Sequence, residues 1–128
     1  MKDRKYTEDI FNEYCRLCVE FDKTRFSDMH RASFREIPWP VLAPCSSITP
    51  NQVNCQSIRD FFIFVRDIKG SPEQRRLLRE ARNRYHPDRW ASKKVVLSVA
   101  TELERIHVKQ TGLVVSQEIN RIFDALPS

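Results

Sequence analysis

Glycine is scarce in this sequence of 128 residues, which contains only Gly70 and Gly112. Two-residue hairpin turns, phosphate-binding loops and dinucleotide-binding loops all depend on glycine. The scarcity argues against a sheet of tight hairpins, a P-loop enzyme and a dinucleotide-binding enzyme. Long hydrophobic runs are also lacking, and none approaches the roughly 20 apolar residues that span a bilayer. The charged N-terminus offers no apolar signal core, so we expect an intracellular protein of the cytoplasm or nucleus, without a membrane partner.

Cysteine occurs at only four positions, whose spacing matches a metal site poorly. Cys15 and Cys18 have the spacing of a zinc knuckle, but Cys45 and Cys55 lie ten residues apart. Cys18 also falls on the apolar stripe of a predicted helix, which is the usual place of a structural thiol. Without a secretion signal a disulfide is not expected. We therefore expect no metal and no cofactor, with a zinc site as the alternative.

The apolar residues recur at helical spacing through most of the chain, which predicts an all-α fold. Helices are predicted over residues 7–22, 49–66, 71–85 and 93–126. Residues 23–34 form either a short helix or an irregular connection. The last region is either one helix or two helices separated at Gly112. Its first half predicts a buried stripe of Val96, Val99, Ala100, Leu103 and Ile106.

Proline marks several predicted boundaries. Thr49 and Ser71 each precede a proline and are suitable cap residues, so we predict that helices begin there. Pro87 is predicted to end the second of these helices, because the residue before a proline avoids the helical region. The proline-rich residues 35–48 are predicted to be extended and packed on the body by Trp39. A ligand for a polyproline-binding domain is the alternative.

The excess positive charge is concentrated in one stretch. Residues 71–94 contain eight Lys and Arg against three Asp and Glu, whereas the rest of the chain has equal numbers of both kinds. On a helix, Arg75, Arg79 and Arg82 share the side opposite the apolar residues. Charge gathered in this way indicates a face that binds a partner.

The basic helix leads directly into the tripeptide His86-Pro87-Asp88. Because proline makes this tripeptide rigid, a partner that binds it pays little ordering entropy. His86 and Asp88 flank the proline, so their side chains are expected to diverge, and no nucleophile motif lies nearby. We therefore expect a binding surface and not an enzyme.

Residues 78–88, Leu-Arg-Glu-Ala-Arg-Asn-Arg-Tyr-His-Pro-Asp, resemble the second helix and signature loop of a J-domain. Members of that family dock on DnaK-type heat-shock chaperones and stimulate their ATPase. The resemblance implies that His86, Pro87 and Asp88 form the triggering loop. It also implies that a chaperone contacts the neighbouring basic side chains, Arg75, Arg79, Arg82 and Arg89.

Over about residues 35–126 the chain is also similar to the J-like C-terminal region of NF-kappa-B-inhibitor-like proteins and related fungal-type J-like proteins. The matching segments are residues 37–40, 61–64, 79–90 and 96–98. The resemblance implies a small multi-helix J-like domain, in which an antiparallel helix pair surrounds the His-Pro-Asp loop. The expected division is an N-terminal helical arm (1–34), a proline-rich connection (35–48) and the J-like domain (49–128).

Two features depart from an ordinary J-domain. The leucine-glycine turn of its first helix is missing, and the 29 residues between Asp88 and Glu118 form an extra helical segment. The ankyrin repeats of some relatives are also absent. One alternative is therefore a J-like protein-binding module without chaperone activity. A second is nucleic-acid binding, in which phosphates would be neutralised by Arg75, Arg79, Arg82, Arg84 and Arg89. The oligomeric state stays open.

Overall fold

The computed structural model describes residues 2–127, and it describes side chains from Arg4 onward. The α-helices are α1 (Lys2–Lys23), α2 (Cys55–Lys69), α3 (Ser71–Arg84), α4 (Pro87–Lys93), α5 (Val95–Ser98) and α6 (Glu102–Asp124). Short 3-10 turns are η1 (Phe34–Glu36), η2 (Cys45–Ser47) and η3 (Pro50–Gln52). Between residues 2 and 127 there is no β-strand, so the predicted all-α class is confirmed. In the same part of the chain, no helix combines the length and the apolar character needed to cross a membrane.

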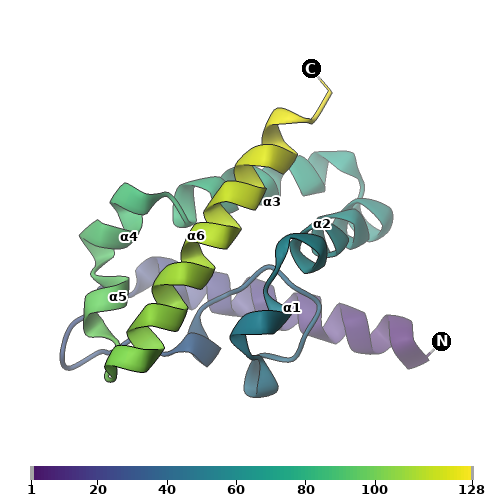
Figure 1. Cartoon of the computed structure of the whole chain (residues 1–128). Coiled ribbons are helices and arrows are strands. Elements are labelled where there is room, and N and C mark those ends of the chain that lie inside the picture. The colour runs from purple at the N-terminus through teal and green to yellow at the C-terminus, as the bar shows by residue number, and fades with distance from the viewer. Residues whose placement is uncertain (1, 128) are drawn as a thin grey trace.

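The helices share one hydrophobic core. Figure 1 shows α6 crossing one face of the molecule, with α3 behind it and α1 along the opposite side. Helix α1 buries Phe11, Tyr14 and Phe21 in this core, together with Cys18. Helix α1 is therefore not a separate layer. Its buried side chains share the core with residues of α2 and α3.

Helix α2 begins later than the sequence predicts. The proposed start at Thr49 leads only into the 3-10 turn η3, in which Gln52 Oε1 accepts a hydrogen bond from Thr49 N at 2.8 Å. The backbone leaves the helical region at Val53, and a second cap then starts α2: Asn54 Oδ1 accepts from Ser57 N at 2.9 Å. The prediction of one helix from residue 49 was wrong because two consecutive cap residues, Thr49 and Asn54, lie five residues apart.

Helices α2 and α3 pack closely around a tight turn. Gly70, with φ 95°, ends α2 in a backbone conformation that side chains with a Cβ rarely adopt. The Gln74 side chain on α3 is buried and donates from Nε2 to the carbonyl oxygen of Phe62 at 3.1 Å. The predicted helix over residues 71–85 is confirmed to within one residue.

Helix α3 ends before Pro87, and His86, the residue before this proline, is outside the helical region, as predicted. Pro87 also begins a second helix, α4, which was not predicted from the sequence. Helix α3 ends at Arg84, and the next residue, Tyr85, is its C-cap. His86 is extended and caps α4, with Pro87 at the first helical position. Proline is favoured there because its fixed φ suits a helix and its missing N–H would have no helical partner.

Helix α6 is continuous through Gly112, so the predicted region 93–126 is not divided there; it is interrupted instead at residues 99–101. The predicted buried stripe over residues 96–106 is confirmed for Val99, which is fully buried, but wrong for Leu103, 65% exposed, and Ile106, 46% exposed. The prediction assumed one continuous helix through residues 99–101. These residues are not helical, and Thr101 caps a new helix with a different buried face. The buried face of α6 is set instead by Val108, Thr111, Val115 and Ile119.

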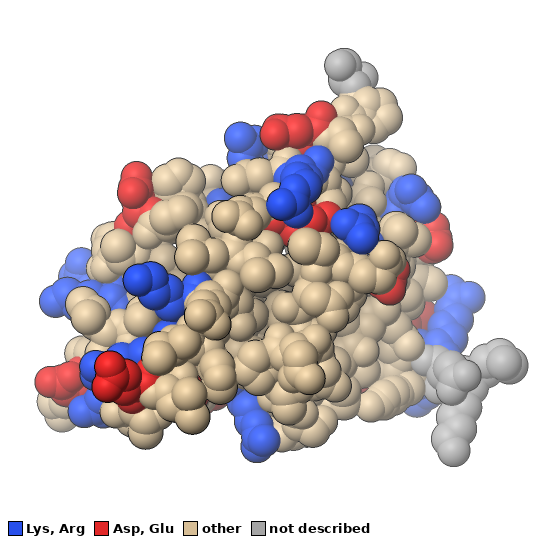
Figure 2. Space-filling model, in the orientation of Figure 1, with Lys and Arg blue, Asp and Glu red and all other residues tan. Residues whose placement is uncertain are grey.

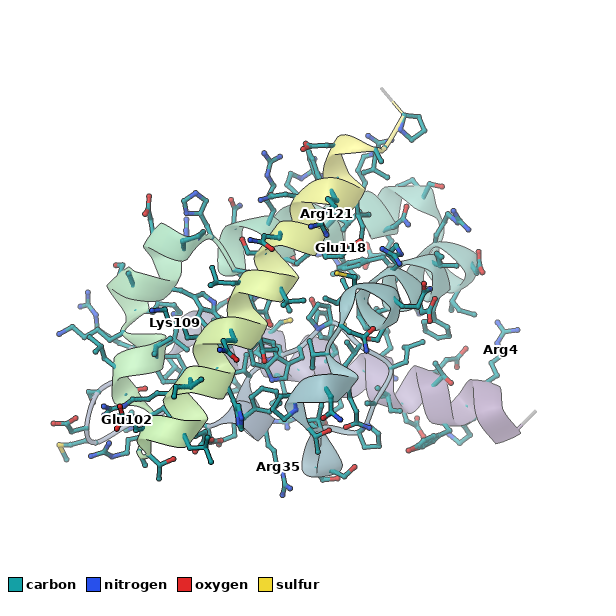
Figure 3. The ribbon with its side chains drawn as sticks, in the orientation of Figure 1. Arg4, Arg35, Glu102, Lys109, Glu118 and Arg121 are labelled. Atoms are coloured by element: carbon teal, nitrogen blue, oxygen red, sulfur yellow. The ribbon has the colours of Figure 1, made fainter. Side chains whose placement is uncertain are left out.

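A buried ion pair connects α2 with α6. The carboxylate of Glu118 is only 2% exposed and accepts from Arg59 Nη1 at 3.2 Å and from Arg121 Nη1 at 2.5 Å (Figure 3). Burial opposes the charged form, but the hydrogen bonds from Arg121, Cys55 and Arg59 lower the pKa of Glu118 below its usual value. The carboxylate therefore stays charged inside the fold.

The proline-rich residues 35–48 lie against the core. Ile37, Trp39 and Val41 are each buried, as predicted for Trp39. Trp39 Nε1 donates to the Phe34 carbonyl oxygen at 2.8 Å, which anchors the segment. The prediction of a fully extended stretch is corrected by η1 and η2, which occupy its two ends.

Candidate functional site

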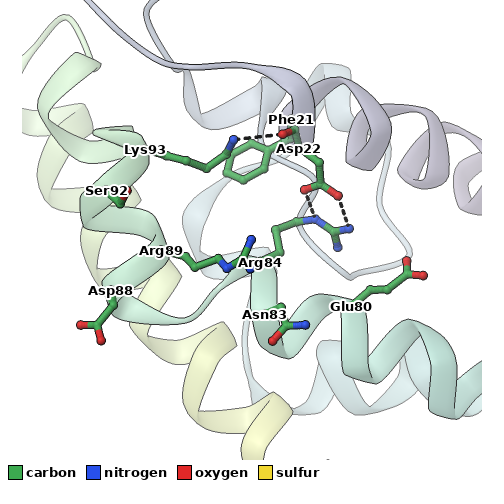
Figure 4. Close-up of a pocket in the computed structure, with 9 residues that line it drawn as sticks. All are labelled: Phe21, Asp22, Glu80, Asn83, Arg84, Asp88, Arg89, Ser92 and Lys93. Carbon is green, nitrogen blue, oxygen red and sulfur yellow. Dashed lines mark hydrogen bonds and ion pairs between the residues drawn. The ribbon is translucent and has the colours of Figure 1, made fainter.

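The tripeptide His86-Pro87-Asp88 lies at an exposed helix start. The side chain of His86 is 56% exposed and that of Asp88 is 94% exposed. His86 Nδ1 accepts a hydrogen bond from Asp88 N at 3.1 Å. A ring nitrogen that accepts in this way carries no proton, so the neutral imidazole has its N–H at Nε2. The tripeptide therefore presents a ring N–H donor and a carboxylate to solvent. Figure 4 shows the Asp88 carboxylate pointing away from the ends of α1 and α3.

A buried aromatic cluster supports the tripeptide. Tyr85 and Trp90 flank it in sequence and are 2% and 7% exposed. Their ring centroids lie 5.5 Å apart, and Trp39 packs on them at 5.9 Å and 6.0 Å. The Tyr85 hydroxyl donates to the carbonyl oxygen of Pro38. Because both flanking residues are fixed in the core, the exposed residues between them are preorganised.

The C-terminal end of α1 contacts residues on both sides of the tripeptide in sequence. Arg84 donates from Nε and Nη2 to the two carboxylate oxygens of Asp22 at 2.8 and 2.9 Å. Lys93 Nζ donates to the carbonyl oxygens of Asp22 at 3.2 Å and Thr24 at 2.7 Å. Figure 4 shows both contacts converging on the end of α1. Arg84 precedes the tripeptide and Lys93 follows it. Because both are bound to the end of α1, together they fix the angle between α3 and α4.

The Arg84 guanidinium is charged although it is buried. Burial alone would lower the pKa of Arg84, but the hydrogen bonds to Asp22 raise it above its usual value. The expectation that Arg84 is available to neutralise phosphate was therefore wrong, because its donors are used inside the fold. Sequence reasoning missed Asp22, which lies 62 positions away and belongs to no local motif.

The predicted docking arginines of α3 differ in their surroundings. Arg75 Nη2 donates to the Pro127 carbonyl oxygen at 2.9 Å, and the Arg82 guanidinium lies 4.6 Å from the centroid of the Phe123 ring. Arg79, between them, is exposed and has no hydrogen bond or ion pair with the other described residues. The structure thus brings Arg75 and Arg82 to the end of α6 and leaves Arg79 open to a partner.

Arg76 and Arg89 lie outside this row. The Arg76 guanidinium donates to Glu73 at 2.6 Å and to Glu80 at 2.6 Å, so neighbouring carboxylates balance its charge. Arg89 lies on α4 and lines an open hollow of about 510 Å³ between the ends of α1, α3 and α4 (Figure 4). It contacts no described residue through an ion pair, which leaves its charge available beside the tripeptide.

The cysteines are free thiols in the structure. Cys18 is buried, and burial raises the pKa of its thiol to about 11, so the reactive thiolate is disfavoured. Burial also raises the pKa of Cys15. Within the described part of the chain, no three His, Cys, Asp or Glu side chains come close enough to hold a metal ion. Cys18 is a core side chain, and Cys15 packs against the core.

Comparison with models of protein families, with curated proteins and with solved structures gives no match to this chain.

Proposed function

We propose that this chain is a J-like co-chaperone or adaptor, which binds a DnaK-type heat-shock chaperone and stimulates its ATPase. The observation that carries the proposal is the exposed His86-Pro87-Asp88 tripeptide, held between a basic helix and a buried aromatic cluster. Exposure makes the tripeptide accessible, and the fixed flanks reduce the entropy lost on binding.

The charged residues suggest how the contact forms. Arg79 on α3 and Arg89 on α4 have no carboxylate partner among the described residues, and they lie on the two helices that flank the tripeptide. Positive charge at these positions attracts an acidic surface and speeds association. The His86 Nε2–H donor and the Asp88 carboxylate then supply directional hydrogen bonds to the partner.

Several contacts favour a protein partner over a nucleic acid. Arg84 is buried on Asp22, Arg76 is neutralised by two glutamates, and Arg75 is bound to the Pro127 carbonyl oxygen. Fewer arginines are therefore free to contact phosphates than the composition of α3 implies. A short acidic patch on a protein requires only the few cations that are left.

ATPase stimulation tests the proposal directly. Single-turnover hydrolysis is measured for a panel of DnaK-type chaperones with the wild-type chain, with His86→Gln and with His30→Gln. His30 is an exposed histidine far from the tripeptide in sequence and serves as the matched control. We expect stimulation by the wild type and by His30→Gln, and a loss of at least about tenfold with His86→Gln, equivalent to roughly 1.4 kcal/mol. No stimulation across the panel, or equal stimulation by all three, rejects the function.

A further inference from the structure

An apolar groove lies between the α4–α5 segment and α6. Its volume is about 340 Å³, which is at the lower end of the range for ligand pockets. Leu97 of α5 and Leu113 of α6 line it, and they are 68% and 45% exposed. Figure 2 shows a broad uncharged area over α6, with lysine and arginine atoms at its margin above α4 and α5. Two large aliphatic side chains are thus open to solvent in one depression.

The groove has an aromatic wall because one residue of α6 lacks a side chain. A Cβ atom at Gly112 would lie 2.6 Å from the ring of Trp90, and both residues line the groove. The indole therefore reaches the backbone of α6 and is held in the core. A rigid wall of this kind loses little entropy when an apolar side chain packs on it.

The charges at the groove are all of one sign. Lys94 and Lys109 line it, no carboxylate does, and neither ammonium group has an ion-pair partner among the described residues. Lys109 projects from α6 beside α4 and α5 (Figure 3). Lys94 has φ 61° and ψ 35°, a left-handed conformation that a residue with a Cβ seldom adopts. The turn between α4 and α5 thus places a cation at the groove.

We propose that this groove binds a partner peptide in which aliphatic side chains alternate with carboxylates. The aliphatic side chains pack against Leu97, Leu113 and Trp90, and the carboxylates pair with Lys94 and Lys109. Pro87 also lines the groove, so the bound peptide lies beside the His-Pro-Asp tripeptide. A recessed apolar surface lined by two cations fits single side chains of a peptide better than it fits a flat bilayer. The proposal goes beyond the ATPase function and does not depend on it.

Peptide arrays and fluorescence anisotropy test the groove. The array holds short peptides that permute leucine and aspartate, with a matched set in which lysine replaces aspartate. The best leucine–aspartate peptide is then labelled with fluorescein and titrated with the wild type, Leu113→Asp, Lys109→Glu and Leu103→Asp. Leu103 is the matched control, because it is an exposed leucine of the same helix that does not line the groove.

We expect aspartate peptides to be retained over lysine peptides, and the dissociation constant to rise at least tenfold with Leu113→Asp or Lys109→Glu, equivalent to about 1.4 kcal/mol. Leu103→Asp leaves the affinity unchanged. The titration contains no chaperone, so this proposal and the ATPase function fail separately. Equal retention of both peptide sets overturns the proposal, as does equal weakening by Leu103→Asp. If the chain binds phosphatidylserine vesicles and no peptide, the groove is a membrane-binding site instead. If Leu113→Asp changes the sedimentation of the chain alone, the groove is a self-association site instead.

Discussion

The guanidinium of Arg84 and the carboxylate of Asp22 form a two-pronged ion pair, with N–O distances of 2.8 and 2.9 Å. The arginine side chain is 4% exposed, whereas the aspartate is 51% exposed. This pair ties α1 to the end of α3, immediately before the exposed tripeptide. The most buried charge near the candidate site therefore positions the tripeptide and does not itself bind a partner.

Asp22→Asn is expected to destabilise the fold by about 2–3 kcal/mol. Removing one partner of a buried pair leaves an uncompensated charge, although the half-exposed carboxylate places the cost below the usual maximum. Urea unfolding at neutral pH measures the loss. Asp9→Asn is the control, because Asp9 is exposed and its oxygen lies 4.0 Å from Lys5 Nζ, an arrangement that contributes about 0.5 kcal/mol or less. Equal losses for both variants would contradict the role of the buried pair.

Local signals explain which parts of the fold could be predicted. Helix α3 was predicted well because the proline after Ser71, the apolar spacing and the helix end all lie within the same stretch. The start of α2 was predicted too early, because the cap signal at Thr49 leads only into a 3-10 turn and the cap at Asn54 was not recognised. The exposure of Leu103 also escaped prediction, since periodicity alone does not show where a helix is interrupted.

In the candidate site, too, the features with local sequence signals could be predicted and those that depend on tertiary contacts could not. His86 and Asp88 were proposed from a short motif, and both are exposed in the structure. The burial of Arg84 and the partnership of Arg82 with Phe123 depend on contacts across 62 and 41 positions. A basic residue on a predicted helix surface is therefore not known to be free until its tertiary neighbours are known.

Gly112→Ala is expected to destabilise the chain by about 1–3 kcal/mol, although alanine is the better helix former by about 1 kcal/mol. The new methyl group would lie 2.6 Å from the Trp90 ring, which cannot move freely in the core. Thermal unfolding measures the effect, and Ser116→Ala on the same helix is the control. In a Trp90→Leu background the penalty of Gly112→Ala should vanish, as a double-mutant cycle detects. A penalty unchanged in that background would exclude the close contact as its cause.

The contribution of Glu118 to stability is expected to depend on pH. Its folded-state pKa is lowered, so its stabilisation is present above the unfolded pKa of about 4.3 and is lost as pH falls through the folded value. Glu118→Gln should therefore cost about 1–3 kcal/mol at neutral pH, and the cost should shrink as the pH falls below the unfolded value. Urea unfolding across this range provides the measurement, with exposed Glu20→Gln as the control. A constant difference at every pH would show that lost packing, and not lost charge, is responsible.

Alanine variants of Arg79 and Arg82 should differ in their effect on folding stability. The Arg82 guanidinium lies over the Phe123 ring, so Arg82→Ala is expected to cost about 0.5–1 kcal/mol of folding free energy. Arg79 is exposed and has no hydrogen bond or ion pair with the other described residues, so Arg79→Ala should change stability by less than about 0.5 kcal/mol.

If Arg79 steers an acidic partner, Arg79→Ala slows association with the chaperone several-fold at low salt, where the screening length is about 10 Å or more. At about 1 M salt, where that length is near 3 Å, the rates of the variant and the wild type should converge. Stopped-flow association provides the rates. Arg35→Ala is the control, because Arg35 is an exposed arginine on η1 at the lower edge of the molecule, away from α3 (Figure 3). If Arg35→Ala slows association as much as Arg79→Ala, the overall positive charge and not the α3 face attracts the partner.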